Sequence, residues 1–190
     1  MTTFEDDIRN SVKTLRDGGV ILYPTDTVWG LGCDATNAAA VEKIFRIKQR
    51  EESKSLIVLV DGEPMLERYA ANIPEIVFEL VSVSDTPMTV IYPEGRNLAA
   101  GICSEDGSVG IRICSESFCS ELISRFRKPI VSTSANISGM PAPAIFDEID
   151  EAIIKSAGYV VTYRQDDRQK HKPSSIIKID KNGSFKIIRM

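Results

Sequence analysis

Residues 20–32 read VILYPTDTVWGLG. The first four are apolar and follow Gly18-Gly19, a pair that suits the end of a helix, so they predict a buried strand over 20–23. From Pro24 onward the chain is expected to leave the strand as a loop with hydroxyls, a carboxylate and two glycines. Thr25 and Thr27 lie on one side of an extended segment, so both hydroxyls can face a ligand. The alternative is a turn whose threonines bind local backbone groups.

Apolar spacing on either side of this stretch predicts alternating helices and strands. Phe4, Ile8, Val12 and Leu15 recur at helical spacing. Asn37 can cap a second helix with an inner face of Val41, Ile44, Phe45 and the stem of Lys48, and residues 61–84 predict two short helices separated at Pro74. Further strands are predicted at 56–60, 88–92, 109–113, 129–132, 159–162, 175–179 and 185–189, and further helices near 116–126 and 147–156.

This order of elements predicts an α/β (α+β) protein with one twisted, mixed β-sheet and flanking helices. Strands and helices alternate early, whereas the last two strands flank Asn182-Gly183, which is typical of a hairpin. With 190 residues and 43% hydrophobic content, the chain is expected to form one domain over 1–190.

Charge and composition narrow the class of protein. The net charge of -4 and the pI near 5.2 disfavour a dedicated nucleic-acid binder, which usually has a basic surface. The acidic N-terminus lacks the apolar core of a signal peptide, and no run reaches membrane-spanning length. A cytoplasmic protein is therefore expected.

Two other sequence patterns do not indicate a functional site. The four cysteines show no CxxC spacing and are expected to be reduced and mostly buried, while a zinc site made of Cys103, Cys114, Cys119 and His171 would have irregular spacing. We therefore predict no protein metal site. Residues 30–35, GLGCDA, fit a dinucleotide-binding fingerprint, but they are too far from the preceding strand for its strand-to-helix turn.

Cations follow the second predicted helix. The segment 48–55 reads KQREESKS, with Lys48, Arg50 and Lys54 as its basic residues. Lys48 and Arg50 can act together only if the helix ends near Lys48, because residues two apart point to opposite sides of a helix. Together they could neutralise a triphosphate, Lys48 as a mobile charge and Arg50 as a planar fork. A solvated surface of mixed charge is the alternative.

Polar side chains also occur on or beside three later strands. Arg112 emerges from the strand VGIRI beside Gly110 and could bind a substrate carboxylate or simply face solvent. The strand at 129–132 ends in a cluster of hydrogen-bonding side chains, Ser132, Thr133, Ser134 and Asn136. We expect this cluster to lie at the carboxyl end of the strand, where α/β sheets bind ligands. Residues 172–177, KPSSII, place Ser174 and Ser175 before an apolar strand, and Arg189 lies in the last strand.

The order of these motifs resembles the YrdC-like family. The resemblance runs from about 18 to 189 and rests on GGVILYPTDTVWGLGCDA, the Lys48-x-Arg50 pair with Lys54-Ser55, PMTVI, VGIRI, STSANISG and PSSII. A related YciO-like branch is expected to lack the pair and the S-x-N ending. Departures from the family pattern are Glu51, Thr86 and Ser175. Longer members of the family have an extra C-terminal domain, and this sequence is expected to be a short bacterial form without it.

The resemblance implies an L-threonylcarbamoyladenylate synthase, a nucleotidyltransferase that uses ATP with Mg²⁺, L-threonine and bicarbonate or CO2. Its product would feed N6-threonylcarbamoyladenosine synthesis in tRNA through a TsaD-type transferase, with direct tRNA binding left open. It implies Thr25, Arg112 and Ser132 for threonine, Lys48, Arg50, Ser134, Asn136 and Arg189 for ATP, Lys48 and Arg50 for catalysis, and Thr27, Lys54, Thr133, Ser174 and Ser175 as possible pocket lining.

No side chain has the setting of an activated nucleophile, so we expect the substrates to react with one another while the protein positions them. Two alternatives stay open. An RNA-binding module would bind unmodified tRNA without ATP turnover, and a carbamoyladenylate-forming relative would use carbamoyl phosphate in place of threonine and bicarbonate.

Overall fold

The computed structural model describes residues 2–49 and 56–190. Its helices form where the apolar spacing predicts them, and several begin at a side-chain cap. The Thr3 hydroxyl accepts a hydrogen bond from the Asp6 N–H, and the Asp6 carboxylate accepts one from the Thr3 N–H. The helices are α1 (Phe4–Arg16), α2 (Ala38–Lys48), α3 (Glu63–Tyr69), α4 (Ile76–Ser82), α5 (Ser117–Phe126) and α6 (Glu151–Ser156), with a 3-10 turn, η1 (Phe146–Glu148).

The strands of the described residues form one nine-stranded sheet in the order β7-β1-β2-β6-β3-β5-β4-β8-β9. The pairs β7/β1, β3/β5 and β4/β8 are parallel and the other neighbours antiparallel, which confirms the predicted mixed sheet. The strands are β1 (Ile21–Tyr23), β2 (Gly30–Gly32), β3 (Ile57–Val60), β4 (Met88–Tyr92), β5 (Val109–Ile113), β6 (Ile130–Ser134), β7 (Tyr159–Val160), β8 (Ser175–Ile179) and β9 (Phe185–Arg189).

Strand β2 corrects the prediction that the chain stays a loop to Gly32. It pairs with β1 on one side and β6 on the other, and this second pairing extends β6 to Ser134, past the predicted end at 132. A Cβ at Gly32 would lie 2.6 Å from Tyr23 Cε1 and 2.9 Å from the Val131 carbonyl oxygen. The glycine therefore serves close backbone approach, which period-2 alternation does not reveal.

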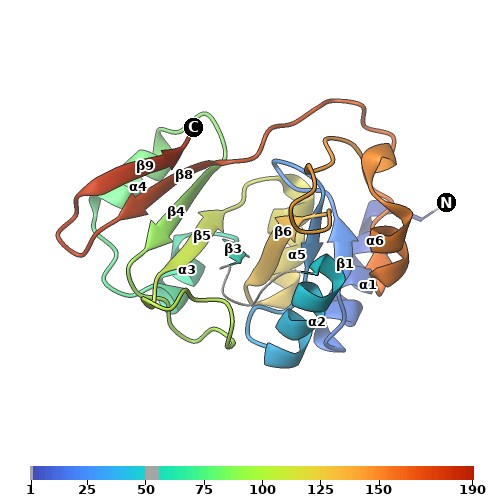
Figure 1. The fold of residues 1–190 in the computed structure, drawn as a ribbon, viewed down its shortest axis with the longest axis horizontal. Helices are drawn as coiled ribbons and strands as arrows, with labels where there is room; N and C mark the ends of the chain where they lie inside the picture. The colour runs from blue at the N-terminus through green and yellow to red at the C-terminus, as the bar shows by residue number, and fades with distance from the viewer. Residues whose placement is uncertain (1, 50–55) are drawn as a thin grey trace.

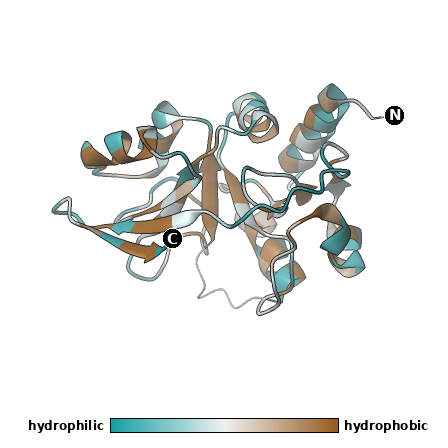
Figure 2. Cartoon of the chain, turned by 90° about the horizontal axis from the view of Figure 1, so that it is seen from above, coloured by the Kyte–Doolittle hydropathy of each residue, from teal (hydrophilic) through white to brown (hydrophobic). Residues whose placement is uncertain are grey.

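Helices cover the sheet, and the two ends of the molecule differ (Figure 1). Strands β8 and β9 lie beside α4 at one end, while α1 and α6 lie at the other. Apolar strands occupy the middle of the molecule, with helices that turn apolar residues toward them (Figure 2). No helix within residues 2–49 and 56–190 has the length and apolarity needed to cross a membrane.

Strand β7 is shorter than the predicted strand over 159–162. The Val161 N–H still donates to the Leu22 carbonyl, but the Thr162 N–H donates to the buried carboxylate of Asp7 in α1. Asp7 also accepts hydrogen bonds from the Tyr159 hydroxyl and the Tyr163 N–H. The carboxylate thus diverts the chain from the sheet and ties it to α1.

Candidate functional site

A cavity of about 290 Å³ lies over the sheet where β2, β5 and β6 meet the segment before β8. Most of its polar lining consists of hydroxyls and two guanidinium groups. The lining residues are Thr27, Val28, Gly30, Leu56, Ile57, Arg112, Ser132, Thr133, Ser134, Ala142, Pro173, Ser174 and Arg189. The structure therefore brings together predicted site residues from four separate motifs. A second cavity of about 730 Å³ shares Leu56 and Ile57 with it and includes Ser108 and Lys178.

Arg112 is the most deeply buried cation of this lining, with 4% of its surface exposed. Its Nη2 lies 2.9 Å from Asp26 Oδ1, a contact at ion-pair distance but without hydrogen-bond geometry, and donates to Thr27 Oγ1 at 3.4 Å. Its Nε is buried and has no hydrogen-bond partner in the described part of the chain. A buried guanidinium with an unused donor is suited to a carboxylate or phosphate.

Thr25 and Thr27 do not behave alike. The Thr25 hydroxyl donates to the Val28 carbonyl at 2.8 Å and accepts from the Thr27 N–H at 3.0 Å, and the two threonine hydroxyls lie 2.9 Å apart. Thr25 is thus engaged in the local turn and is absent from the cavity lining, whereas Thr27 lines the cavity. The turn that the sequence left as an alternative is present.

Lys48 is the last residue of α2, as predicted, and Gln49 follows in the left-handed conformation. The prediction of a mobile charge is wrong: Lys48 is 1% exposed, and its ammonium donates to the carbonyls of Ser134 at 2.5 Å and Asn136 at 2.7 Å. The ammonium has these acceptors because β6 extends to Ser134 and the chain then turns back over the helix end, where the Ser138 N–H donates to the Lys48 carbonyl.

The remaining predicted residues are placed around this cavity or apart from it. Arg189 lines it and donates from Nε and Nη2 to the Ser174 carbonyl, while the Ser174 hydroxyl is 2.8 Å from that of Thr89. Asn136 lines a neighbouring cavity, and its amide donates to the Met140 carbonyl. Ser175 is the first residue of β8 and is not in the lining. Arg50 and Lys54 lie outside the described residues.

The thiols are free, as predicted, and Cys33, Cys114 and Cys119 are buried. Cys119 lies below the 24–27 turn, where its sulfur is 3.3 Å from the Pro24 carbonyl. Burial raises the pKa of this thiol well above its ordinary value, and the neighbouring Cys114 raises it further. A thiol that stays protonated is a poor nucleophile, so Cys119 has a packing role.

Sequence reasoning overlooked Asp26 and Arg164. Asp26 stands between the two singled-out threonines and next to the Arg112 guanidinium, so its place in the PTDT motif could have identified it. Arg164 carried no such signal, because it lies in an irregular segment, yet its Nη1 donates to the Thr25 carbonyl at 3.2 Å.

The chain is similar to a known protein family over most of its length. The family model Sua5_yciO_yrdC, described as Telomere recombination, matches residues 13–190. The chain belongs to the Sua5/YciO/YrdC family. Among its relatives, a threonylcarbamoyl-AMP synthase of Psychromonas ingrahamii is 34% identical over 150 residues, which are 77% of this chain and 78% of the relative. A threonylcarbamoyl-AMP synthase of Stenotrophomonas maltophilia is 35% identical over 149 residues, which are 77% and 80% of the two chains.

Solved structures of the family share the fold. Sua5 of P. abyssi, complexed with L-threonine, matches with a TM-score of 0.82 and 26% identity over 93% of this chain and 52% of that one. The chain thus spans about half the length of that Sua5. E. coli YciO, at 23% identity, has the same TM-score over 96% of this chain and 87% of its own, and shows the fold alone.

Proposed function

We propose that the chain is an L-threonylcarbamoyladenylate synthase, a nucleotidyltransferase that converts L-threonine, bicarbonate or CO2 and ATP to threonylcarbamoyl-AMP and pyrophosphate. The observation that carries the proposal is the buried Arg112, which lines a cavity together with several hydroxyls and whose Nε has no hydrogen-bond partner among the described residues. The names of the relatives and the L-threonine in the Sua5 structure support it.

On the threonine side, Arg112 would bind the substrate carboxylate. The Asp26 carboxylate beside it keeps the guanidinium in one orientation, and the hydroxyls of Thr27 and Ser132 in the same lining can bind the polar groups of the amino acid. A guanidinium held in this way binds a carboxylate through two parallel hydrogen bonds, which fixes the orientation of the amino group. The geometry supports a small, zwitterionic substrate.

On the nucleotide side, Ser134 and Arg189 line the cavity, and Asn136 lies just beyond. Lys48 acts in this proposal as a positioning residue, since its ammonium donates to the backbone of the strand end that presents Ser134. Arg50, one position past Gln49, stays the sequence-based candidate for direct contact with the triphosphate.

The chemistry needs no covalent enzyme intermediate. The threonine amine attacks the carbon of bicarbonate, a C–N bond forms, and water leaves to give a carbamate. A carbamate oxygen then attacks the α-phosphorus of ATP, and the bond to the bridging oxygen breaks as pyrophosphate departs with the electron pair. The protein contributes alignment and positive charge near the leaving group.

Mg²⁺ is part of the proposal as a companion of ATP. No Asp or Glu is found in the cavity lining within the described residues, so the site suits an ion held by phosphate oxygens and water. When bound, the ion would offset charge on the phosphates. We further propose that the product passes to a TsaD-type transferase for N6-threonylcarbamoyladenosine synthesis in tRNA, and that the reaction takes place in the cytoplasm.

Pyrophosphate release by the purified chain tests the proposal. The assay contains ATP and Mg²⁺, and L-threonine or bicarbonate is omitted in turn. Release that requires both substrates is expected. Release that requires neither, or release that needs carbamoyl phosphate, would contradict it.

A further inference from the structure

Arg164 lies in the irregular segment 161–174, which leads from β7 to the residues of the cavity before β8. Its backbone is left-handed, with φ 65°, a conformation that is uncommon for a residue other than glycine. Its side chain is about one-fifth exposed. Residues in this backbone region are worth examining for contacts that hold them, and the Arg164 side chain makes several.

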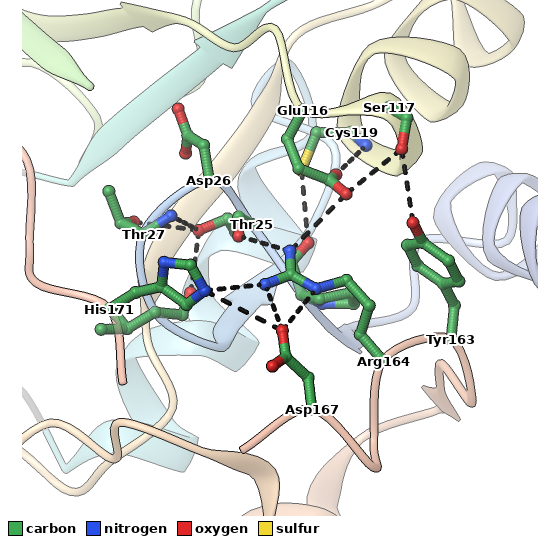
Figure 3. A network of polar contacts seen from close by, with 12 residues as sticks. Thr25, Asp26, Thr27, Glu116, Ser117, Cys119, Tyr163, Arg164, Asp167 and His171 are labelled. Atoms are coloured by element: carbon green, nitrogen blue, oxygen red, sulfur yellow. Dashed lines mark hydrogen bonds and ion pairs between the residues drawn. The ribbon is translucent and has the colours of Figure 1, made fainter. Parts of the chain in front are cut away.

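Three side chains surround the guanidinium (Figure 3). Its Nε and Nη2 donate to Asp167 Oδ2 at 3.1 and 2.8 Å, Nη2 lies 3.1 Å from Nε2 of His171, and Nη1 lies 3.6 Å from Glu116 Oε1. Hydrogen bonds from the Gln169 N–H and from Arg164 lower the pKa of Asp167, so this carboxylate is ionised at neutral pH. The guanidinium is thus oriented by two carboxylates and an imidazole.

The fourth contact reaches the candidate site. Nη1 of Arg164 donates to the Thr25 carbonyl at 3.2 Å. The next two residues, Asp26 and Thr27, are those that Arg112 contacts from the cavity side. The 25–27 turn is therefore held between two guanidinium groups, one inside the cavity and one outside its lining.

We propose that Arg164 is a positioning residue for the threonine side of the site. It fixes the 25–27 turn so that Asp26 orients Arg112 and the Thr27 hydroxyl faces the cavity. The segment that contains Arg164 continues to Pro173 and Ser174 in the cavity lining. Arg164 therefore connects this part of the lining with the 25–27 turn. This inference rests on the proposed function, because the ligand that it positions is L-threonine.

The test compares Arg164→Gln with a control in the same segment, Arg168→Gln, whose guanidinium is mostly exposed and pairs with Asp147. Calorimetric titration measures L-threonine affinity, and steady-state pyrophosphate release gives KM for threonine and for ATP. Arg164→Gln should weaken threonine binding about tenfold, the effect of one hydrogen bond to a charged group, with KM for ATP unchanged. Arg168→Gln should match the wild type in every measurement.

Two milder variants keep the test decisive if Arg164→Gln folds poorly. Asp167→Asn should weaken threonine binding less, and Arg164→Lys should restore part of what Arg164→Gln loses. Equal threonine affinity in wild type and Arg164 variants would overturn the inference alone. A parallel loss of threonine affinity, ATP affinity and Tm would also overturn it, since it would indicate a general structural role. A wild type that neither binds threonine nor releases pyrophosphate would instead refute the proposed function.

Discussion

Arg112 shows how a single buried charge can indicate a ligand. Burial of a guanidinium costs free energy unless each donor finds an acceptor, and Asp26 and Thr27 engage Nη2 but not Nε. A bound carboxylate would supply the missing acceptor. The alternation of VGIRI placed Arg112 opposite the apolar face of β5, but the burial of its side chain follows from how neighbouring strands and the 25–27 turn cover it.

Replacement of Arg112 by lysine tests whether this guanidinium binds the substrate carboxylate. Lysine keeps the charge but loses the planar, two-pronged geometry, so L-threonine affinity should fall by about 10- to 100-fold. Calorimetry with L-threonine alone measures the change. Arg125→Lys, at an exposed ion pair with Glu5 and Glu121, serves as the control and should bind as the wild type does. Unaltered affinity in Arg112→Lys would remove Arg112 from the threonine site.

Lys48→Met tests whether the buried ammonium shapes the site. Methionine fills similar space but cannot donate to the carbonyls of Ser134 and Asn136, so the free energy of unfolding should fall by about 1–3 kcal/mol. Pyrophosphate release should fall by about 100-fold because Ser134 loses its position. Arg46→Gln, on the exposed side of α2, should change neither quantity. Normal turnover in Lys48→Met would show that this contact is dispensable.

Among the elements, β2 is the strand that the hydrophobic pattern of the sequence did not predict. Its three residues follow a turn rich in hydroxyls and show no alternation, so the sequence favoured a loop. Its strand conformation comes from tertiary pairing with β1 and β6, and Gly32 allows that pairing at close distance. By contrast, α1, α2 and β4 had strong periodic or cap signals and lie where predicted.

Gly32→Ala should destabilise the fold at this point. The added methyl group would overlap the Tyr23 ring and the Val131 carbonyl, and a buried backbone oxygen cannot move away easily, so the free energy of unfolding should fall by about 1–3 kcal/mol. Urea denaturation measures it. Gly110→Ala, within strand β5, would place its methyl group at ordinary contact distances of 3.5 Å or more and should stay within about 0.5 kcal/mol of the wild type. Equal stability of the two variants would contradict the close packing of β2.

Asp7→Asn tests the link between α1 and the segment that carries Arg164. The carboxylate accepts hydrogen bonds from Tyr159, Thr162 and Tyr163, and an amide would turn an N–H group toward some of these donors. The free energy of unfolding should fall by about 1–3 kcal/mol in urea titrations. Asp17→Asn, at an exposed position that follows α1, should change the free energy of unfolding by less than about 0.5 kcal/mol. If both variants are equally stable, Asp7 does not hold this segment.

At the scale of the whole molecule, strand order explains why motifs far apart in sequence meet. β2, β6, β3 and β5 are consecutive neighbours in the sheet, so the 25–27 turn, the hydroxyls of Ser132 and Ser134 and Arg112 come to one face. The identity of these motifs was readable in the sequence, because hydroxyls and arginines beside apolar strands stand out. The sequence could not predict the distances between these motifs, the burial of Lys48 or the contacts of Arg164, because they depend on long-range packing.

The central claim concerns the product, and isotope labelling tests it most directly. The chain is incubated with ATP, Mg²⁺, L-threonine and ¹³C-bicarbonate, and the nucleotides are analysed at once by mass spectrometry. We expect an adenylate that contains both threonine and the labelled carbon, formed together with pyrophosphate, and expect it to be strongly reduced with Arg112→Lys. An adenylate without threonine or without the label, or unchanged ATP, would contradict the account.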